Sequence, residues 1–142
     1  MRDFVLDATV VAFSNLDLNA PSGGRLVRSL NILRCVVNFE GRVRYNNKLR
    51  REYEAHVRQR RNDIIEAFFA ILDSPRAIRV TRSTLSASDH GHAQRARWPN
   101  HDQHLLAAGL GGNRPCIYVT EERLANCHAR IHRSFGIDVR MV

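Results

Sequence analysis

The sequence contains a single lysine, and its acidic residues are fewer than its basic ones. Lys48 is the only lysine, so 21 of the 22 basic residues are arginine; they face 14 acidic residues, and the net charge at pH 7 is +8. This charge attracts polyanions, and arginine binds phosphate through two nitrogens at once. A genome rich in G and C explains the preference for arginine over lysine, but not the excess over acidic residues. The composition favours nucleic acid, or an acidic protein, as a partner.

Long apolar runs and paired cysteines are also missing. No apolar segment approaches the roughly 18 residues of a membrane-spanning helix, and the amino terminus lacks a signal-peptide pattern. The cysteines are an odd number without a CxxC pair, which is typical of free thiols in a reducing cytoplasm; they are Cys35, Cys116 and Cys127. We therefore expect a cytoplasmic protein without a membrane segment, with residues 1–142 forming one domain.

Short apolar segments alternate with helical patterns along the chain. We expect strands at 4–6, 41–45, 77–80, 116–119 and 136–140. We expect helices at 26–37, 48–72 with a break near Asn62, 102–110 and 121–132. The segment 81–100 has no hydrophobic period and is predicted to be a long loop. The alternation predicts an α/β fold, a three-layer α/β/α sandwich with a central parallel sheet of about five strands.

Several carboxylates are predicted to lie at one edge of this sheet, outside the carboxyl ends of the strands, where ligands bind in such folds. Asp7 ends the first strand, and Glu121 and Glu122 follow the fourth. Asp102 begins a helix, and Glu52 lies early in the helix after the second strand. Like charges this close are unfavourable unless a divalent cation neutralises them. Oxygen ligands without cysteine favour Mg²⁺ or Mn²⁺ over zinc.

Each acid taken alone also has a structural interpretation. Asp102, Glu121 and Glu122 are typical of helix amino ends, where the helix dipole favours negative charge. Glu52 can pair with neighbouring arginines. Asp7 differs, because a carboxylate directly after a buried strand is costly unless it has a use.

Four segments carry recognisable motifs and follow one another along the chain: D-A-T-V-V from Asp7, L-R-R-E-Y-E-A-H-V from Leu49, D-Q-H-L-L-A-A-G-L from Asp102 and Y-V-T-E-E-R-L from Tyr118. Together they resemble the motifs of the PIN-domain family, and the resemblance covers nearly the whole chain. It implies a Mg²⁺- or Mn²⁺-dependent endoribonuclease. Small basic members of that family include VapC-type toxins, so the resemblance also implies an antitoxin partner and a homodimer.

The resemblance also implies roles for individual residues. The acids that bind metal and catalyse hydrolysis fall on Asp7, Glu52, Asp102 and Glu122, with support from Thr9, Thr120 and Glu121. Glu52 is preferred over Glu54 by register alone. The sequence departs from the family pattern at the fourth acid, which is usually aspartate, so the choice between the two adjacent glutamates stays open. His101 also stands where an acid or a polar residue is common.

Nucleic-acid contacts are predicted near the same edge. The candidates for phosphate binding are Arg50, Arg51, Arg95 and Arg97. His90, His92 and Trp98 are candidates for base stacking, although Trp98 before a proline also suits an anchoring role. The main alternative function is a PIN-like module that binds nucleic acid or protein without cleaving it. A DNA-directed, structure-specific nuclease is disfavoured because the chain is too short for the added helical clamps.

Overall fold

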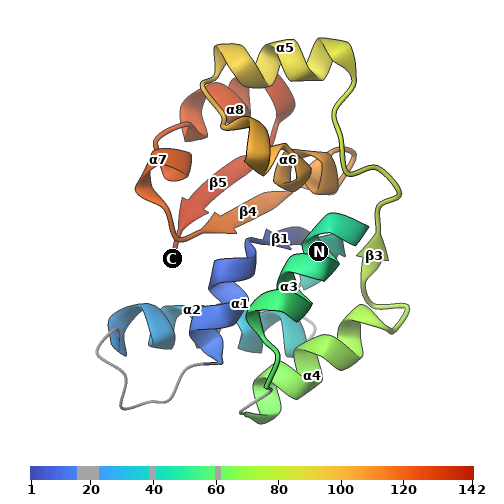
Figure 1. The fold of residues 1–142 in the computed structure, drawn as a ribbon, viewed down its shortest axis with the longest axis vertical. Coiled ribbons are helices and arrows are strands. Elements are labelled where there is room, and N and C mark those ends of the chain that lie inside the picture. Colours follow the sequence, from blue (N-terminus) through green and yellow to red (C-terminus); the bar gives the residue numbers. More distant parts are fainter. Residues whose placement is uncertain (16–22, 39–40, 60–61) are drawn as a thin grey trace.

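A sheet of five parallel strands runs through the protein, in the order β3-β2-β1-β4-β5. The computed structural model describes residues 1–15, 23–38, 41–59 and 62–142 (Figure 1). The strands are β1 (Arg2–Leu6), β2 (Gly41–Tyr45), β3 (Ile78–Arg79), β4 (Cys116–Val119) and β5 (Asp138–Met141). All neighbouring strands pair in parallel.

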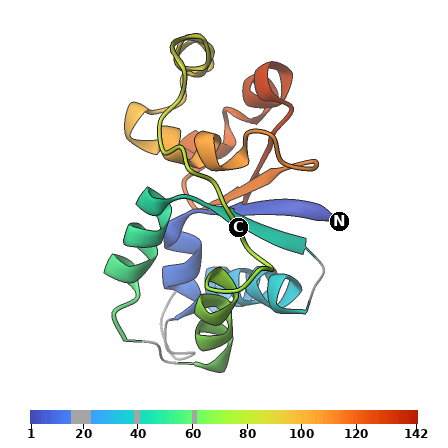
Figure 2. The ribbon, with the colours of Figure 1, turned by 90° about the vertical axis from the view of Figure 1, so that its right-hand side faces the viewer.

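Helices cover both faces of the sheet, and Figure 2 shows the two layers edge-on. One layer contains α1 (Ala8–Ser14), α2 (Gly23–Val37), α3 (Asn47–His56) and α4 (Asp63–Leu72). The other contains α5 (Ala87–Arg95), α6 (Gln103–Gly109), α7 (Glu122–Ala125) and α8 (His128–Phe135), with the 3-10 turn η1 (Asn100–Asp102) leading into α6. The predicted three-layer α/β/α fold is confirmed. No helix of the described ranges is long and apolar enough to cross a membrane.

The central strands are apolar on both faces, which is why they read as unbroken hydrophobic runs. Val5 and Leu6 of β1, and Ile117 of β4, have no exposed surface. In the α1–α4 layer, Tyr53 packs edge-on against Phe68 with ring centroids 5.5 Å apart. Burial of these side chains is the main stabilising contribution to the sandwich.

The chain changes direction across the sheet between β1 and β4. From β1 it proceeds outward through β2 and β3, and then it returns to the other side of β1 for β4 and β5. The connections leaving β1 and β4 therefore diverge, and ligands in α/β folds bind outside the carboxyl ends of the strands at such a point. The amide of Asp7 donates to the Tyr118 carbonyl at 3.0 Å, which joins the two strand ends at this point.

The break predicted near Asn62 is confirmed. Asn62 is the N-cap of α4, and its side chain accepts a hydrogen bond from the amide of Ile65 at 2.9 Å. An uncapped helix amino end leaves backbone donors without partners, so this asparagine favours the start of a new helix here. The preceding helix, α3, has already ended at His56.

Two predictions of local structure are wrong. The segment 81–100 was expected to be a loop, but it contains α5, capped by Ser86, whose hydroxyl accepts from the amide of Asp89 at 3.2 Å. This helix buries only Ala93 and therefore shows no apolar stripe. The single helix expected over 121–132 is divided into α7 and α8.

Candidate active site at the carboxyl ends of β1 and β4

Asp7 lies at the centre of the candidate site. It follows β1 at the N-cap position of α1, yet its side chain makes no capping hydrogen bond. The residue is only 7% exposed. Burial first, and then the negative charges of Asp102 and Glu52, raise the pKa of Asp7 from 3.8 to about 6, while hydrogen bonding from Thr9 acts in the opposite direction. The structure thus couples three predicted acids electrostatically.

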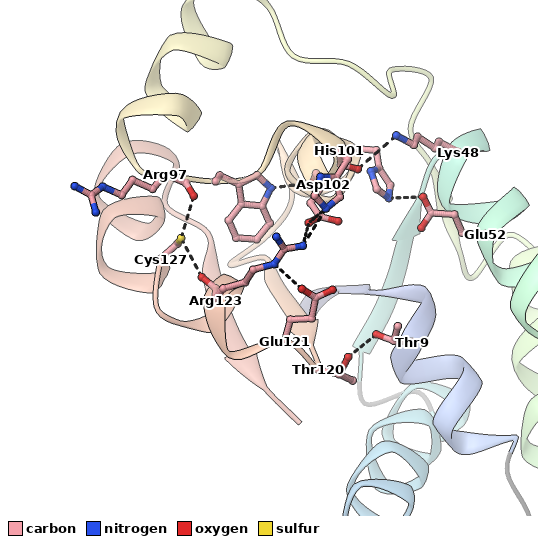
Figure 3. A network of polar contacts seen from close by, with 12 residues as sticks. Thr9, Lys48, Glu52, Arg97, His101, Asp102, Thr120, Glu121, Arg123 and Cys127 are labelled. Atoms are coloured by element: carbon pink, nitrogen blue, oxygen red, sulfur yellow. Dashed lines mark hydrogen bonds and ion pairs between the residues drawn. The ribbon is translucent and has the colours of Figure 1, made fainter.

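Two predicted hydroxyl residues join the strand ends beside Asp7. Thr9 Oγ1 lies 2.6 Å from Thr120 Oγ1, a hydrogen bond in which either can donate (Figure 3). It connects the start of α1 with the residue that follows β4. The two threonines therefore satisfy each other and hold the two strand ends together.

Asp102 is presented by the turn η1, directly before α6. Its Oδ2 atom is buried and accepts no hydrogen bond from the described residues. His101 Nε2 lies 3.2 Å from that oxygen and Arg123 Nη2 lies 3.7 Å from it. Burial is the first cause of the raised pKa of Asp102, the charge of Glu121 raises it further, and His101 lowers it.

Glu52 approaches from α3 on the opposite side (Figure 3). Its Oε1 lies 2.9 Å from Nε2 of His104, a side chain of α6 that is 2% exposed. The two atoms are close enough for an ion pair but are not aligned for a hydrogen bond, so neither ring nitrogen of His104 has a hydrogen-bond partner among the described residues. The sequence did not indicate the contact of His104 with Glu52, because the two residues meet only in the tertiary structure.

Arg123 is the other residue that the sequence did not indicate. Its Nε donates to Glu121 Oε2 at 2.6 Å, and its Nη2 lies 3.0 Å from His101 Nε2. The guanidinium therefore sits between Glu121 and Asp102, as Figure 3 shows. Glu122 is exposed at the start of α7, and it is Glu121 whose charge reaches Asp102. The structure brings together the first three predicted acids and Glu121.

The chemistry of these donors suits a hard divalent cation. All are carboxylate oxygens, and Asp102 Oδ2 is a buried acceptor without a hydrogen-bond donor. Their present spacing is wider than a coordination sphere, since no three His, Cys, Asp or Glu side chains of the described ranges are grouped closely enough to hold an ion.

The predicted phosphate-binding arginines have different surroundings. Arg50 pairs with Asp73 at 2.9 Å and with Glu54 at 3.3 Å, so its charge is already neutralised within the fold. The other three, Arg51, Arg95 and Arg97, are exposed.

Trp98 is an anchor within the fold. It is 2% exposed, and its indole Nε1 donates to the carbonyl of Asp102 at 2.8 Å. A ring so deeply buried packs inside the protein and is not available to stack on a base. It fixes the turn that presents Asp102.

No protein-family model matches the chain, and no curated protein is significantly similar to it. The resemblance to the PIN-domain family therefore rests on the four sequence motifs, and membership of that family stays a prediction.

Proposed function

We propose that the protein is a metal-dependent endoribonuclease that hydrolyses phosphodiester bonds in RNA. The observation that carries this proposal is the buried Asp7 carboxyl, whose pKa is raised to about 6 by burial and by the charges of Asp102 and Glu52. Like charges gathered beyond the carboxyl ends of the strands disfavour the metal-free state, and a divalent cation relieves that repulsion. Perturbed carboxyls of this kind are concentrated at functional sites.

Mg²⁺ or Mn²⁺ would be held by Asp7, Glu52 and Asp102, with Glu122 or Glu121 as the fourth acid. When bound, such ions lower the pKa of a water molecule and stabilise the leaving oxygen of the phosphodiester. The chain's own residues position the ligands: the Thr9–Thr120 hydrogen bond joins the strand ends. No side chain of the protein needs to act as a nucleophile.

A specific observation favours a second candidate, a binding module without nuclease activity. Glu52 lies against His104, and Asp102 faces the guanidinium of Arg123, so side chains of the same chain already contact two of the acids. If these pairs persist in the presence of metal, the basic surface would bind RNA or an acidic protein without cleavage.

The proposed partners follow from the nuclease function. RNA is the substrate, and the resemblance to VapC-type toxins adds an antitoxin protein and a homodimer in the cytoplasm. An antitoxin would carry acidic segments complementary to the basic surface, or an arginine that pairs with the carboxylates.

Cleavage of a mixed RNA pool in the presence of Mn²⁺ tests the proposal. We expect Asp7→Asn and Asp102→Asn each to lower the rate by about 100-fold or more, because loss of a metal ligand costs more than loss of an outer partner. Asp63→Asn, which removes an exposed carboxylate at the start of α4, is the matched control. Equal cleavage by all variants would exclude the assigned site. RNA binding without cleavage by the wild-type chain would support the second candidate.

A further inference from the structure

A basic cavity lies between α5 and α8, in the helical layer that also contains α6. Its volume is about 280 Å³, and it is lined by His92, Arg95, Ala96, Arg130, Arg133 and Ser134. We call it the α5–α8 pocket. Three arginines line it and no acidic residue does, so the positive charge gathered there is not neutralised by its own walls.

The three guanidinium groups have no carboxylate partner in the part of the chain that the structure describes. Arg95 Nη2 contacts the ring nitrogen Nδ1 of His92 at 3.0 Å, which orients its guanidinium. Arginine only donates, so Nδ1 of His92 must present its lone pair. Arg130 and Arg133 are exposed on α8. Like charges gathered around a cavity repel one another, and an anion bound there removes the repulsion.

The two helices that form this pocket are held relative to the candidate active site. Trp98, three residues after Arg95, donates through its backbone amide to the carbonyl of Ala93 at 3.0 Å and through its indole to that of Asp102. The Sγ atom of Cys127, just before α8, contacts the carbonyl of Arg97 at 3.7 Å. Because these contacts tie α5 and α8 to the turn that presents Asp102, an anion bound in the pocket is held at a fixed distance from the acids of the candidate site.

We propose that the α5–α8 pocket binds backbone phosphates of the RNA strand whose scissile bond lies at Asp7 and Asp102, an inference that rests on the nuclease function proposed above. Guanidinium groups match phosphate through paired donors. An acidic peptide fits less well, because protein interfaces depend on buried aromatic or aliphatic anchors, and Ala96 is the only apolar side chain of the lining. The pocket sets where the strand is held, and the acids set where it is cut.

The test is the affinity for a short, fluorescently labelled single-stranded RNA, measured by anisotropy in EDTA so that no cleavage occurs. The variant is Arg130→Gln with Arg133→Gln. The matched control is Arg28→Gln with Arg34→Gln, which removes the same charge from exposed positions on α2 in the opposite layer. We expect the pocket variant to bind about tenfold or more weakly and its log–log salt slope to fall by about 1.4, since each phosphate contact in single strands contributes about 0.7.

Two other results would overturn the inference. Equal weakening in the pocket variant and the control would mean that net charge alone binds RNA. Unchanged RNA binding, with loss of binding to a polyglutamate probe, would assign the pocket to an acidic protein. Thermal unfolding of both variants checks that they are folded. The nuclease proposal fails separately: if Asp7→Asn cleaves like the wild type while the pocket variant loses RNA affinity, the pocket stands and the assigned active site does not.

Discussion

Asp7 combines burial with two neighbouring negative charges, and this combination makes it sensitive to pH. Its pKa is about 6 in the folded chain, against an ordinary value of 3.8. The folded state therefore holds this proton more tightly than the unfolded state does. The stability associated with Asp7 is fully present below the ordinary value and is lost as the pH rises through the folded one.

Because folding disfavours the ionised form of Asp7, we predict that Asp7→Asn stabilises the metal-free protein at neutral pH. The pKa shift corresponds to a destabilisation on the order of 3 kcal/mol, which the neutral amide removes. Urea unfolding in EDTA at about pH 4 and about pH 7 is the measurement, and the advantage of the variant should be present only at the higher pH. Asp63→Asn, which removes an exposed carboxylate, should show no such pH dependence. A difference in unfolding free energy of the same size at both pH values would mean that folding does not raise the pKa of Asp7.

The two adjacent glutamates after β4 can be separated by metal affinity. The family resemblance points to Glu122, whereas the charge that reaches Asp102 belongs to Glu121. On electrostatic grounds we expect Glu121→Gln to weaken Mn²⁺ binding about tenfold and Glu122→Gln to leave it nearly unchanged. Isothermal titration calorimetry measures both. A larger loss in Glu122→Gln would support the register implied by the resemblance.

The sequence indicated the acidic residues of the candidate site but not the side chains that contact them. Asp7 was recognisable because a carboxylate seldom ends a buried strand without a use. His104 and Arg123 carried no such signal. His104 lies on an otherwise apolar helix, and Arg123 is one of many arginines, so only their positions in space show that they face Glu52 and Asp102.

At the scale of the elements, Asn46 links α3 to the rest of the site. Its side chain is fully buried, accepts from the amide of Leu49 at 3.1 Å, and donates to the carbonyls of His104 and Arg82 at 2.9 and 3.2 Å. One asparagine thus caps the helix that carries Glu52 and joins it to α6.

We predict that Asn46→Ala lowers the free energy of unfolding by about 2–4 kcal/mol, because it removes a cap and leaves two carbonyls without donors. It should also weaken Mn²⁺ binding, since α3 is no longer tied to α6. Asn62→Ala is the control: Asn62 caps α4 in the same way and donates to Ser14, but α4 carries none of the site residues. Urea unfolding and calorimetry should show lost stability in both variants and lost metal affinity only in Asn46→Ala. Equal metal affinity in the two would show that the cap does not position Glu52.

At the scale of the whole molecule, a continuous core of buried side chains lies on both sides of the sheet. It includes residues of β1, β2 and β4 and of helices from both layers. Because such a core is lost as a unit, we expect one cooperative unfolding transition.

Trp98, the only tryptophan, makes that expectation testable. It lies in the helical layer of α5–α8, so its fluorescence reports on one side of the sheet, while far-UV circular dichroism reports on all helices. We predict coincident urea transitions by the two probes. Separated transitions would indicate two units and would contradict the expectation of one domain over residues 1–142.

The sequence by itself determined the α/β alternation, the parallel sheet, the basic surface and the position of Asp7, because each depends on local pattern or total charge. The tertiary structure decided the rest. Side chains far apart in the chain meet only through strand order, which places Thr9 against Thr120, Glu52 against His104 and Arg123 against Asp102. The α5–α8 pocket has the same origin, since its arginines come from two helices that are separated along the chain and meet only when the layer is assembled.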